Sequence, residues 1–135
     1  RYKGYTIRQL CQEMHDLYVS HDVKQLQKEM FRARYFPRAV MNPQEANLAF
    51  VRGQVELVPL REVEGRIAAE GALPYPPGVL CVVPGEIWGG SVQRYFLALE
   101  EGINLLPGFA PELQGVYLEP TGEGRVQAMG YVLKR

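Results

Sequence analysis

A single carboxylate stands at the end of a segment in which two proline turns enclose apolar residues. Residues 73–86 read LPYPPGVLCVVPGE, and Glu86 comes directly after the turn Pro84-Gly85. Proline fixes φ and glycine accepts positive φ, so this turn holds the acid in a rigid place. Such a carboxylate can attract a cationic ligand. It can equally be a solvated turn residue, cap the following helix or pair with an arginine, and these alternatives stay open.

The apolar residues between the two turns predict their own conformation. Residues 79–83 form an unbroken apolar run bounded by turns, which is typical of a short, fully buried strand. Beyond Glu86, the pair Gly89-Gly90 leaves room for close approach of backbone or of a ligand.

The two histidines do not indicate a metal site. His15 and His21 are six residues apart and fall on different predicted helices. No cysteine or carboxylate cluster has ligand spacing with them. We therefore expect no metal, and we interpret His15 as a residue of a solvated helix face.

A basic ridge is the other candidate for binding. Lys24, Lys28 and Arg32 recur every four residues, which places them on one face of a helix. The ridge is either an anion-binding surface or ordinary solvated surface. Glu100 and Glu101 are adjacent, so they lie on different sides of a helix and do not form a catalytic pair. The residues alone show no complete active site.

Helices are predicted in the first part of the chain. Thr6 and Gln9 form a capping box that opens a helix over 6–19. A second helix follows Asp22 as N-cap, with an apolar stripe of Val23, Leu26, Met30 and Phe31. Asn42 and Pro43 open a third helix, with Ala46, Ala49 and Phe50 facing inward, which ends at Gly53.

Short strands and one more helix are predicted in the second part. Residues 55–60 and 67–73 read as two strands that could pair as a hairpin. Ser91 can cap a helix that ends before Pro107, with a stripe of Val92, Tyr95, Phe96, Leu99 and Ile103. Residues 116–118 and 126–133 form a terminal hairpin. Helices first and strands later predict an α+β fold in which three or four helices pack on short strands.

The composition indicates one domain without a strong electrostatic field. The 135 residues fit a single domain spanning 1–135, and 15 basic residues balance 15 acidic ones. This balance argues against nucleic acid or a membrane as partner, and the apolar runs are too short to span a bilayer. Cys11 and Cys81 are interpreted as free thiols of a reducing compartment, which implies a cytoplasmic protein.

Four stretches together carry a resemblance to a known family. AEGALPYPPG at 69–78 is followed by VPGE at 83–86, with YTIRQLCQEMHD at 5–16 and QRYFLALEEG at 93–102. In these the chain resembles the C-terminal domain of the bacterial ornithine/lysine/arginine decarboxylases, which use pyridoxal phosphate. The stretches at 5–16 and 93–102 look most like the ornithine branch.

The resemblance implies that the parent enzyme decarboxylates L-ornithine to putrescine in polyamine biosynthesis. In that family the lysine that binds the cofactor follows a histidine, and none of the four lysines of this chain does. We therefore expect pyridoxal phosphate in another domain of the parent and no cofactor here. The chain begins with Arg1 and reads as a C-terminal fragment, inactive alone. Its expected partners are the cofactor-binding domain of the same polypeptide and further copies in a homo-oligomer.

The resemblance also assigns roles to the residues singled out above. It places this domain against the large domain near the approach to the active site. The expected wall of that approach comprises Pro74, Tyr75, Pro76, Pro77, Gly78, Pro84, Gly85 and Glu86. Two alternatives stay open. One is a regulatory or oligomerisation module that binds an anionic effector, such as a guanine nucleotide, at Lys24, Lys28 and Arg32. The other is the same domain from a lysine or arginine decarboxylase.

Overall fold

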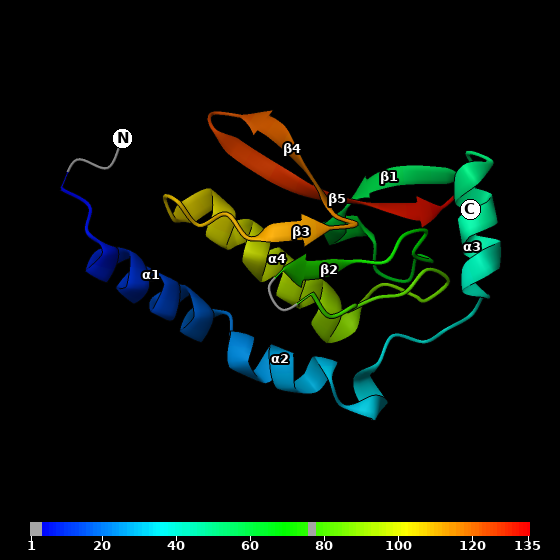
Figure 1. The fold of residues 1–135 in the computed structure, drawn as a ribbon, viewed down its shortest axis with the longest axis horizontal. Helices are drawn as coiled ribbons and strands as arrows, with labels where there is room; N and C mark the ends of the chain where they lie inside the picture. The colour runs from blue at the N-terminus through cyan, green and yellow to red at the C-terminus, as the bar shows by residue number, and fades with distance from the viewer. Residues whose placement is uncertain (1–3, 76–77) are drawn as a thin grey trace.

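The first helix forms as its capping residues predict. A computed structural model describes residues 4–75 and 78–135. Helix α1 spans Ile7–Ser20, and its capping box is complete: the Gln9 amide donates to Thr6 Oγ1, and the Thr6 amide donates to Gln9 Oε1 at 2.7 Å. Leu17 is the buried residue of this helix, and α1 lies at the edge of the fold (Figure 1).

Helix α2 begins where predicted but by another mechanism. It spans Val23–Met30, and the side chain of Asp22 makes no capping hydrogen bond. Asp22 has φ +49°, whereas an N-cap residue needs extended backbone to bring its side chain to the first amides. Because only two residues separate α1 from α2, Asp22 serves to turn the chain. The predicted stripe is confirmed at Val23, Leu26 and Met30 and is wrong at Phe31, which is exposed.

The connection after α2 leads to a peripheral helix. A short 3-10 helix, η1, spans Ala33–Tyr35, and α3 spans Pro43–Val51. Asn42 caps α3 as predicted, accepting a hydrogen bond from the Gln44 amide at 2.9 Å. Of the predicted inward residues only Ala46 is buried. Ala49 is half-buried, and Phe50 packs edge-on against Tyr131 at the end of the molecule.

The strands form two small antiparallel sheets. The larger has the order β1-β5-β4, with β1 at Val55–Pro59, β4 at Tyr117–Gly122 and β5 at Arg125–Leu133. The smaller pairs β2 at Leu73–Tyr75 with β3 at Glu112–Gln114. Strands β4 and β5 confirm the predicted terminal hairpin.

The predicted hairpin between 55–60 and 67–73 is wrong. Strand β1 pairs with β5, with Val55 opposite Leu133, and the 3-10 helix η2 at Leu60–Glu62 leads away from the sheet. Residues 67–72 make single bridges, among them Ala68 to Val132. Strand β5 buries every second residue from Ala128 to Val132, whereas the nearby segment buries the consecutive residues Ala68 and Ala69 and so has no strand-like alternation.

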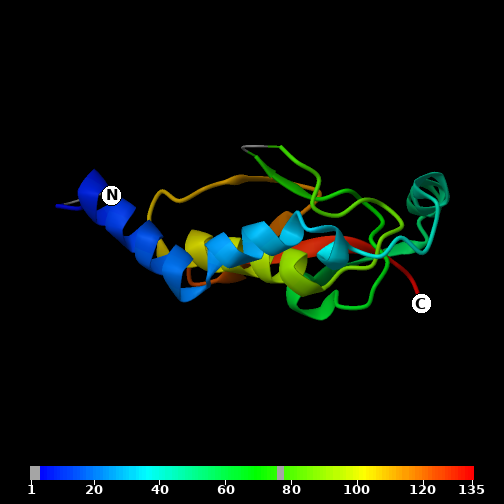
Figure 2. The same ribbon diagram turned by 90° about the horizontal axis from the view of Figure 1, so that it is seen from below.

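The fourth helix is the centre of the core. Helix α4 spans Gly90–Leu105 and lies between α2 and the larger sheet (Figures 1 and 2). Its predicted stripe is buried at Val92, Tyr95, Phe96 and Leu99, and Ile103 is half-buried. Ser91 is not the cap. It is buried in the first turn, and its hydroxyl donates to Glu29 Oε2 at 2.8 Å, which ties α4 to α2. The α+β fold class is confirmed. No helix among the described residues has the length and apolar character needed to cross a membrane.

Candidate functional site

The segment after the first proline turn is a loop, so the prediction of a buried strand at 79–83 is wrong. Only Val82 pairs, with Ala72 across a single bridge. Cys81 and Val82 are buried, whereas Val79 is 44% and Leu80 50% exposed. The apolar run therefore divides between two surfaces, the core on one side and an open pocket on the other. This division explains why the run is apolar throughout without being a strand.

The second turn fixes Glu86. The Glu86 amide donates to the Val83 carbonyl at 3.0 Å, and Glu86 Oε2 accepts from the Val83 amide at 2.8 Å. Gly85, at φ +90°, accepts from the amides of Val40 and Met41 and so ties the turn to the chain before α3. Within the described residues the carboxylate neither caps α4 nor pairs with an arginine. It stabilises its own turn.

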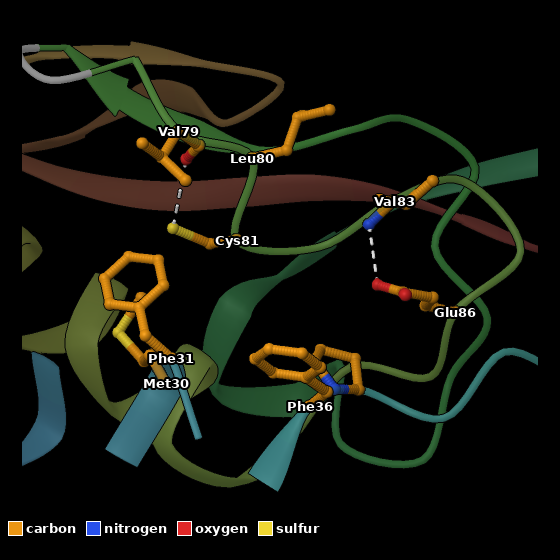
Figure 3. A pocket seen from close by; sticks show the side chains of 9 residues that line it. Met30, Phe31, Phe36, Val79, Leu80, Cys81, Val83 and Glu86 are labelled. Atoms are coloured by element: carbon orange, nitrogen blue, oxygen red, sulfur yellow. Dashed lines mark hydrogen bonds between the residues drawn. The ribbon is translucent and has the colours of Figure 1, made fainter. Parts of the chain in front are cut away.

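A pocket of about 260 Å³ opens between the end of α2 and this loop (Figure 3). Aromatic and aliphatic side chains make most of its wall, and Glu86 contributes a carboxylate to the lining. The lining residues are Met30, Phe31, Phe36, Pro37, Val79, Leu80, Cys81, Val83 and Glu86. Burial raises the pKa of the Cys81 thiol to about 11, so this sulfur is a protonated, unreactive part of the wall near neutral pH.

The first proline turn borders the same pocket in part. Pro74 is buried and lines a smaller cavity of about 60 Å³ that shares Met30, Phe31, Val79 and Cys81 with the larger one. Tyr75 is 53% exposed and Gly78 has φ +77°. Pro76 and Pro77 lie outside the described residues. The structure thus gathers Pro74 and Glu86 around adjoining cavities, although twelve positions separate them in the chain.

Phe31 and Phe36 are pocket residues that sequence reasoning did not select. The helical spacing predicts Phe31 in the core-facing stripe of α2, and no role is predicted for Phe36. Both rings are 55% exposed. The two phenylalanines lie just beyond the end of α2, and Phe36 belongs to no predicted apolar stripe. An aromatic residue without a predicted core position is the signal that could have identified this surface.

The basic ridge is an exposed surface. Lys24 and Lys28 lie on α2, but Arg32 follows the helix end at Met30, so the four-residue repeat does not continue on one helix. All three side chains are exposed. Anion binding at this ridge stays a prediction.

The histidines and the acidic pair of α4 take structural positions. His21 Nε2 lies 2.7 Å from Glu101 Oε2 and links the α1–α2 corner to α4, whereas His15 is exposed. Glu100 accepts from the Ala128 amide at 2.6 Å, so the two adjacent glutamates do point to different elements. No three His, Cys, Asp or Glu side chains gather as metal ligands in the part of the chain that the structure describes.

A comparison with protein families finds one match over the part of the chain that contains both turns and the pocket. The model of the Orn/Lys/Arg decarboxylase C-terminal domain matches residues 24–134. The chain belongs to this family. The matched range includes α2 from its second residue, both proline turns and every residue that lines the pocket.

Individual relatives distinguish branches of the family. The chain is 77% identical over 134 residues to the inducible ornithine decarboxylase of Escherichia coli, and 69% identical over 133 residues to the ornithine decarboxylase of Haemophilus influenzae. Each alignment covers at least 98% of this chain and 18% of the relative. The chain is 34% identical to the lysine decarboxylase LdcA of Pseudomonas aeruginosa, covering 93% of this chain and 17% of the relative. The chain therefore spans about a fifth of the length of these relatives.

Solved structures share the fold. The constitutive lysine decarboxylase of E. coli matches with a TM-score of 0.77 at 32% identity, over 95% of this chain and 18% of that one. Lysine decarboxylase A of P. aeruginosa matches with a TM-score of 0.78 at 31% identity, over 90% of this chain and 16% of that one. The α+β arrangement is thus common to chains that differ in two thirds of their residues.

Proposed function

We propose that this chain is the C-terminal domain of a pyridoxal phosphate-dependent enzyme that decarboxylates L-ornithine to putrescine. The difference in identity carries the choice of substrate: 77%, 74% and 69% to ornithine decarboxylases, against 31–36% to the lysine decarboxylases compared. In the parent this domain packs on the cofactor-binding domain, and the parent assembles as a homo-oligomer in the cytoplasm.

The residues that the structure describes do not fit pyridoxal phosphate. An aldehyde cofactor needs a lysine amine held in a site, and Lys24, Lys28 and Lys134 are all exposed side chains. None follows a histidine. The cofactor therefore belongs to another part of the parent, and no chemical step is assigned to this chain.

The domain instead contributes to the approach to the active site. The proposed wall is the surface of Pro74 to Gly78 together with Pro84 to Glu86. Support comes from the rigid second turn and from the adjoining cavities that Pro74 and Glu86 line. An ionised Glu86 beside apolar walls gives this surface a local negative potential, which favours the approach of the cationic side chain of ornithine.

The substrate proposal is tested with the full-length parent. Turnover of ornithine, lysine and arginine is measured as CO₂ release, with this chain assayed alone beside it in the presence of pyridoxal phosphate. We expect ornithine to be strongly preferred by the parent and no turnover by this chain. A preference for lysine would contradict the ornithine assignment, and CO₂ release by this chain alone would contradict its role as a domain without the reactive group.

The role of Glu86 is tested by Glu86→Gln in the full-length enzyme. Glutamine keeps an acceptor for the Val83 amide while removing the charge, so the turn is preserved. We expect kcat/KM for ornithine to fall about three-fold at low ionic strength with kcat unchanged, and the difference to disappear as salt is added. Glu119→Gln on the exposed strand β4 is the matched control. Equal kcat/KM for Glu86→Gln and wild type at low salt would show that Glu86 is a turn residue only.

A further inference from the structure

Four large apolar side chains are exposed together around the pocket. They are Phe31 and Phe36 from the end of α2 and the segment after it, and Val79 and Leu80 from the loop (Figure 3). Their exposed fractions are 55%, 55%, 44% and 50%. We refer to these four residues as the Phe31 patch. Isolated exposed apolar residues are common on proteins, but a group of them around a concave surface marks an interaction site.

The residues next to the Phe31 patch are packed in the core. Met30 next to Phe31 is 4% exposed, and Cys81 and Val82 next to Leu80 are buried in the core. The loop is held before Val79 by the Gly78 amide, which donates to the Pro74 carbonyl at 3.1 Å. After Leu80 it is held by the bridge of Val82 to Ala72 and by the turn that Glu86 closes. The pocket is therefore formed before anything binds. Its volume of about 260 Å³ is several times the ~30 Å³ share of one liquid water molecule.

The chemistry of the pocket selects an apolar occupant. Glu86 is its one lining residue with an ionisable carboxylate, and one of its oxygens already accepts from the Val83 amide. The remaining side chains of the wall are aromatic, aliphatic or, in Met30 and Cys81, sulfur-containing. Burying an apolar side chain against this wall removes apolar surface from water on both partners, whereas an anionic group would lose hydration and meet the Glu86 carboxylate.

We propose that the Phe31 patch is the contact surface for the cofactor-binding part of the same polypeptide, which places an apolar side chain in the pocket. This inference rests on the proposed function. The chain spans 18% of the length of the ornithine decarboxylases it matches, so most of the parent lies outside it. The pocket is also continuous with the proposed wall of the active-site approach, and such a wall has to face the part that holds the cofactor.

The test uses the full-length enzyme with Leu80→Asp and, as a milder second variant, Leu80→Ala. Leu80 is half exposed in this domain, so neither change removes a core side chain. The matched control is Val51→Asp on α3, which is 73% exposed and lies outside the pocket. Hydrogen exchange is measured for peptides that cover 28–37 and 78–86, together with denaturant unfolding and sedimentation velocity.

We expect Leu80→Asp to accelerate exchange in both peptides about ten-fold or more, the order expected when one leucine side chain loses its burial. Denaturant unfolding of the full-length enzyme should separate into two transitions, one for this domain and one for the rest of the polypeptide, because the contact that couples them is lost. Leu80→Ala should shift both measurements less in the same direction, and Val51→Asp should match wild type. Exchange that is unchanged in Leu80→Asp overturns the inference. A change confined to the sedimentation coefficient also overturns it, because the patch would then contact a second copy.

The result can be separated from the test of substrate. If wild-type enzyme decarboxylates ornithine while Leu80→Asp leaves exchange and unfolding unchanged, only the contact surface is wrong. If wild type does not decarboxylate ornithine, the proposed function fails, whatever the exchange measurements show.

Discussion

Gly85 shows how a single residue holds the loop in place. Its backbone has φ +90°, and its carbonyl accepts from the amides of Val40 and Met41. A Cβ at this position would overlap the Met41 carbonyl oxygen. The glycine of the Pro-Gly-Glu sequence is therefore required both by its dihedral angle and by the close approach of another backbone segment.

Gly85→Ala should destabilise the chain more than Gly53→Ala. Gly53 also has positive φ, at +71°, but a Cβ there meets nothing within 4 Å. The control variant should lower the free energy of unfolding by about 1–2 kcal/mol, the cost of left-handed backbone for an L-residue. Gly85→Ala should cost clearly more, because backbone atoms must also move. Urea unfolding measures both, and equal losses would mean that the Met41 contact yields easily.

Glu29 connects the stability of the chain to pH. Hydrogen bonds from Gln25 and then Ser91 lower the pKa of its carboxyl below the ordinary 4.5, and the nearby Arg94 and Arg32 act in the same direction. A carboxyl whose pKa is lower in the folded state contributes stability above its unfolded pKa. That contribution is lost as pH falls from about 4.5 through the folded value.

Glu29→Gln should therefore make the free energy of unfolding less sensitive to pH below about 4.5, while lowering it at neutral pH. Urea unfolding at a series of pH values from 3 to 7 gives the slope. The control is Glu45→Gln on the exposed side of α3. Wild-type and Glu29→Gln curves that run parallel below pH 4.5 would contradict the assignment.

At the scale of single residues, the turn that carries Glu86 could be predicted from the sequence, but its hydrogen bond with the Val83 amide could not. The proline and glycine positions were enough to predict a rigid turn that delivers Glu86. The bond to the Val83 amide depends on the side-chain rotamer within that turn, for which the sequence has no signal. The exposure of Val79 and Leu80 depends on the neighbouring end of α2, which is about fifty residues away in the chain.

Among the elements, α1 depends most on its own sequence. Its buried residue, Leu17, lies near the C-terminal end, so the first turns have little tertiary support. The capping box at Thr6 and Gln9 supplies local hydrogen bonds in its place. The long exposed part of α1 in Figure 1 is thus stabilised from its N-terminus.

Thr6→Ala should loosen the start of α1 while the rest of the fold stays intact. Loss of an N-cap costs about 1 kcal/mol, so amide exchange in the first turns should accelerate about five-fold. The global free energy of unfolding should change less, because those turns contribute little buried surface. Arg8→Ala, an exposed change in the same turn, is the control. Unchanged exchange at residues 7–11 would show that the cap is not needed.

Elements defined by local signals were predicted, and those defined by partners were not. Thr6 and Asn42 act within three residues of themselves, so both helix starts follow from sequence. Aspartate is a common N-cap residue, but the two-residue corner between α1 and α2 gives Asp22 a left-handed backbone conformation in which its side chain does not cap. Ser91 was misassigned for a similar reason, since its hydroxyl is used by Glu29 on α2.

On the scale of the whole molecule, one helix joins the helical layer to the larger sheet. Phe96 on α4 is fully buried and packs edge-on against both Trp88 and Tyr95. Helix α4 contacts α2 on one side and β5 on the other, as Figures 1 and 2 show. Removing this ring should therefore affect both helical and sheet layers at once.

Phe96→Ala should lower the free energy of unfolding by about 3–5 kcal/mol, the usual cost of removing a buried phenylalanine ring. Leu97→Ala, on the half-buried side of the same helix, should cost distinctly less. Urea unfolding followed by circular dichroism compares the two. Similar losses for both variants would mean that the core is not centred on α4.

The α+β class and the terminal hairpin followed from the order of helical and strand patterns, but the sheet pairing did not. Residues 55–60 have two possible strand partners in sequence, one about ten residues away and the other about seventy. Strand β1 pairs with the distant partner because every second residue of β5 is buried in the core. These residues are Ala128, Gly130 and Val132. That choice is a property of the whole fold.

Trp88 is the single tryptophan of this chain, and it lies 2% exposed with its ring centroid 5.7 Å from that of Phe96. Its fluorescence therefore comes from one known place in the core. Emission should move to longer wavelength when water reaches the indole, but not when the Phe31 patch alone is uncovered. The isolated chain thus carries a built-in optical reporter of its own folding, without any added label.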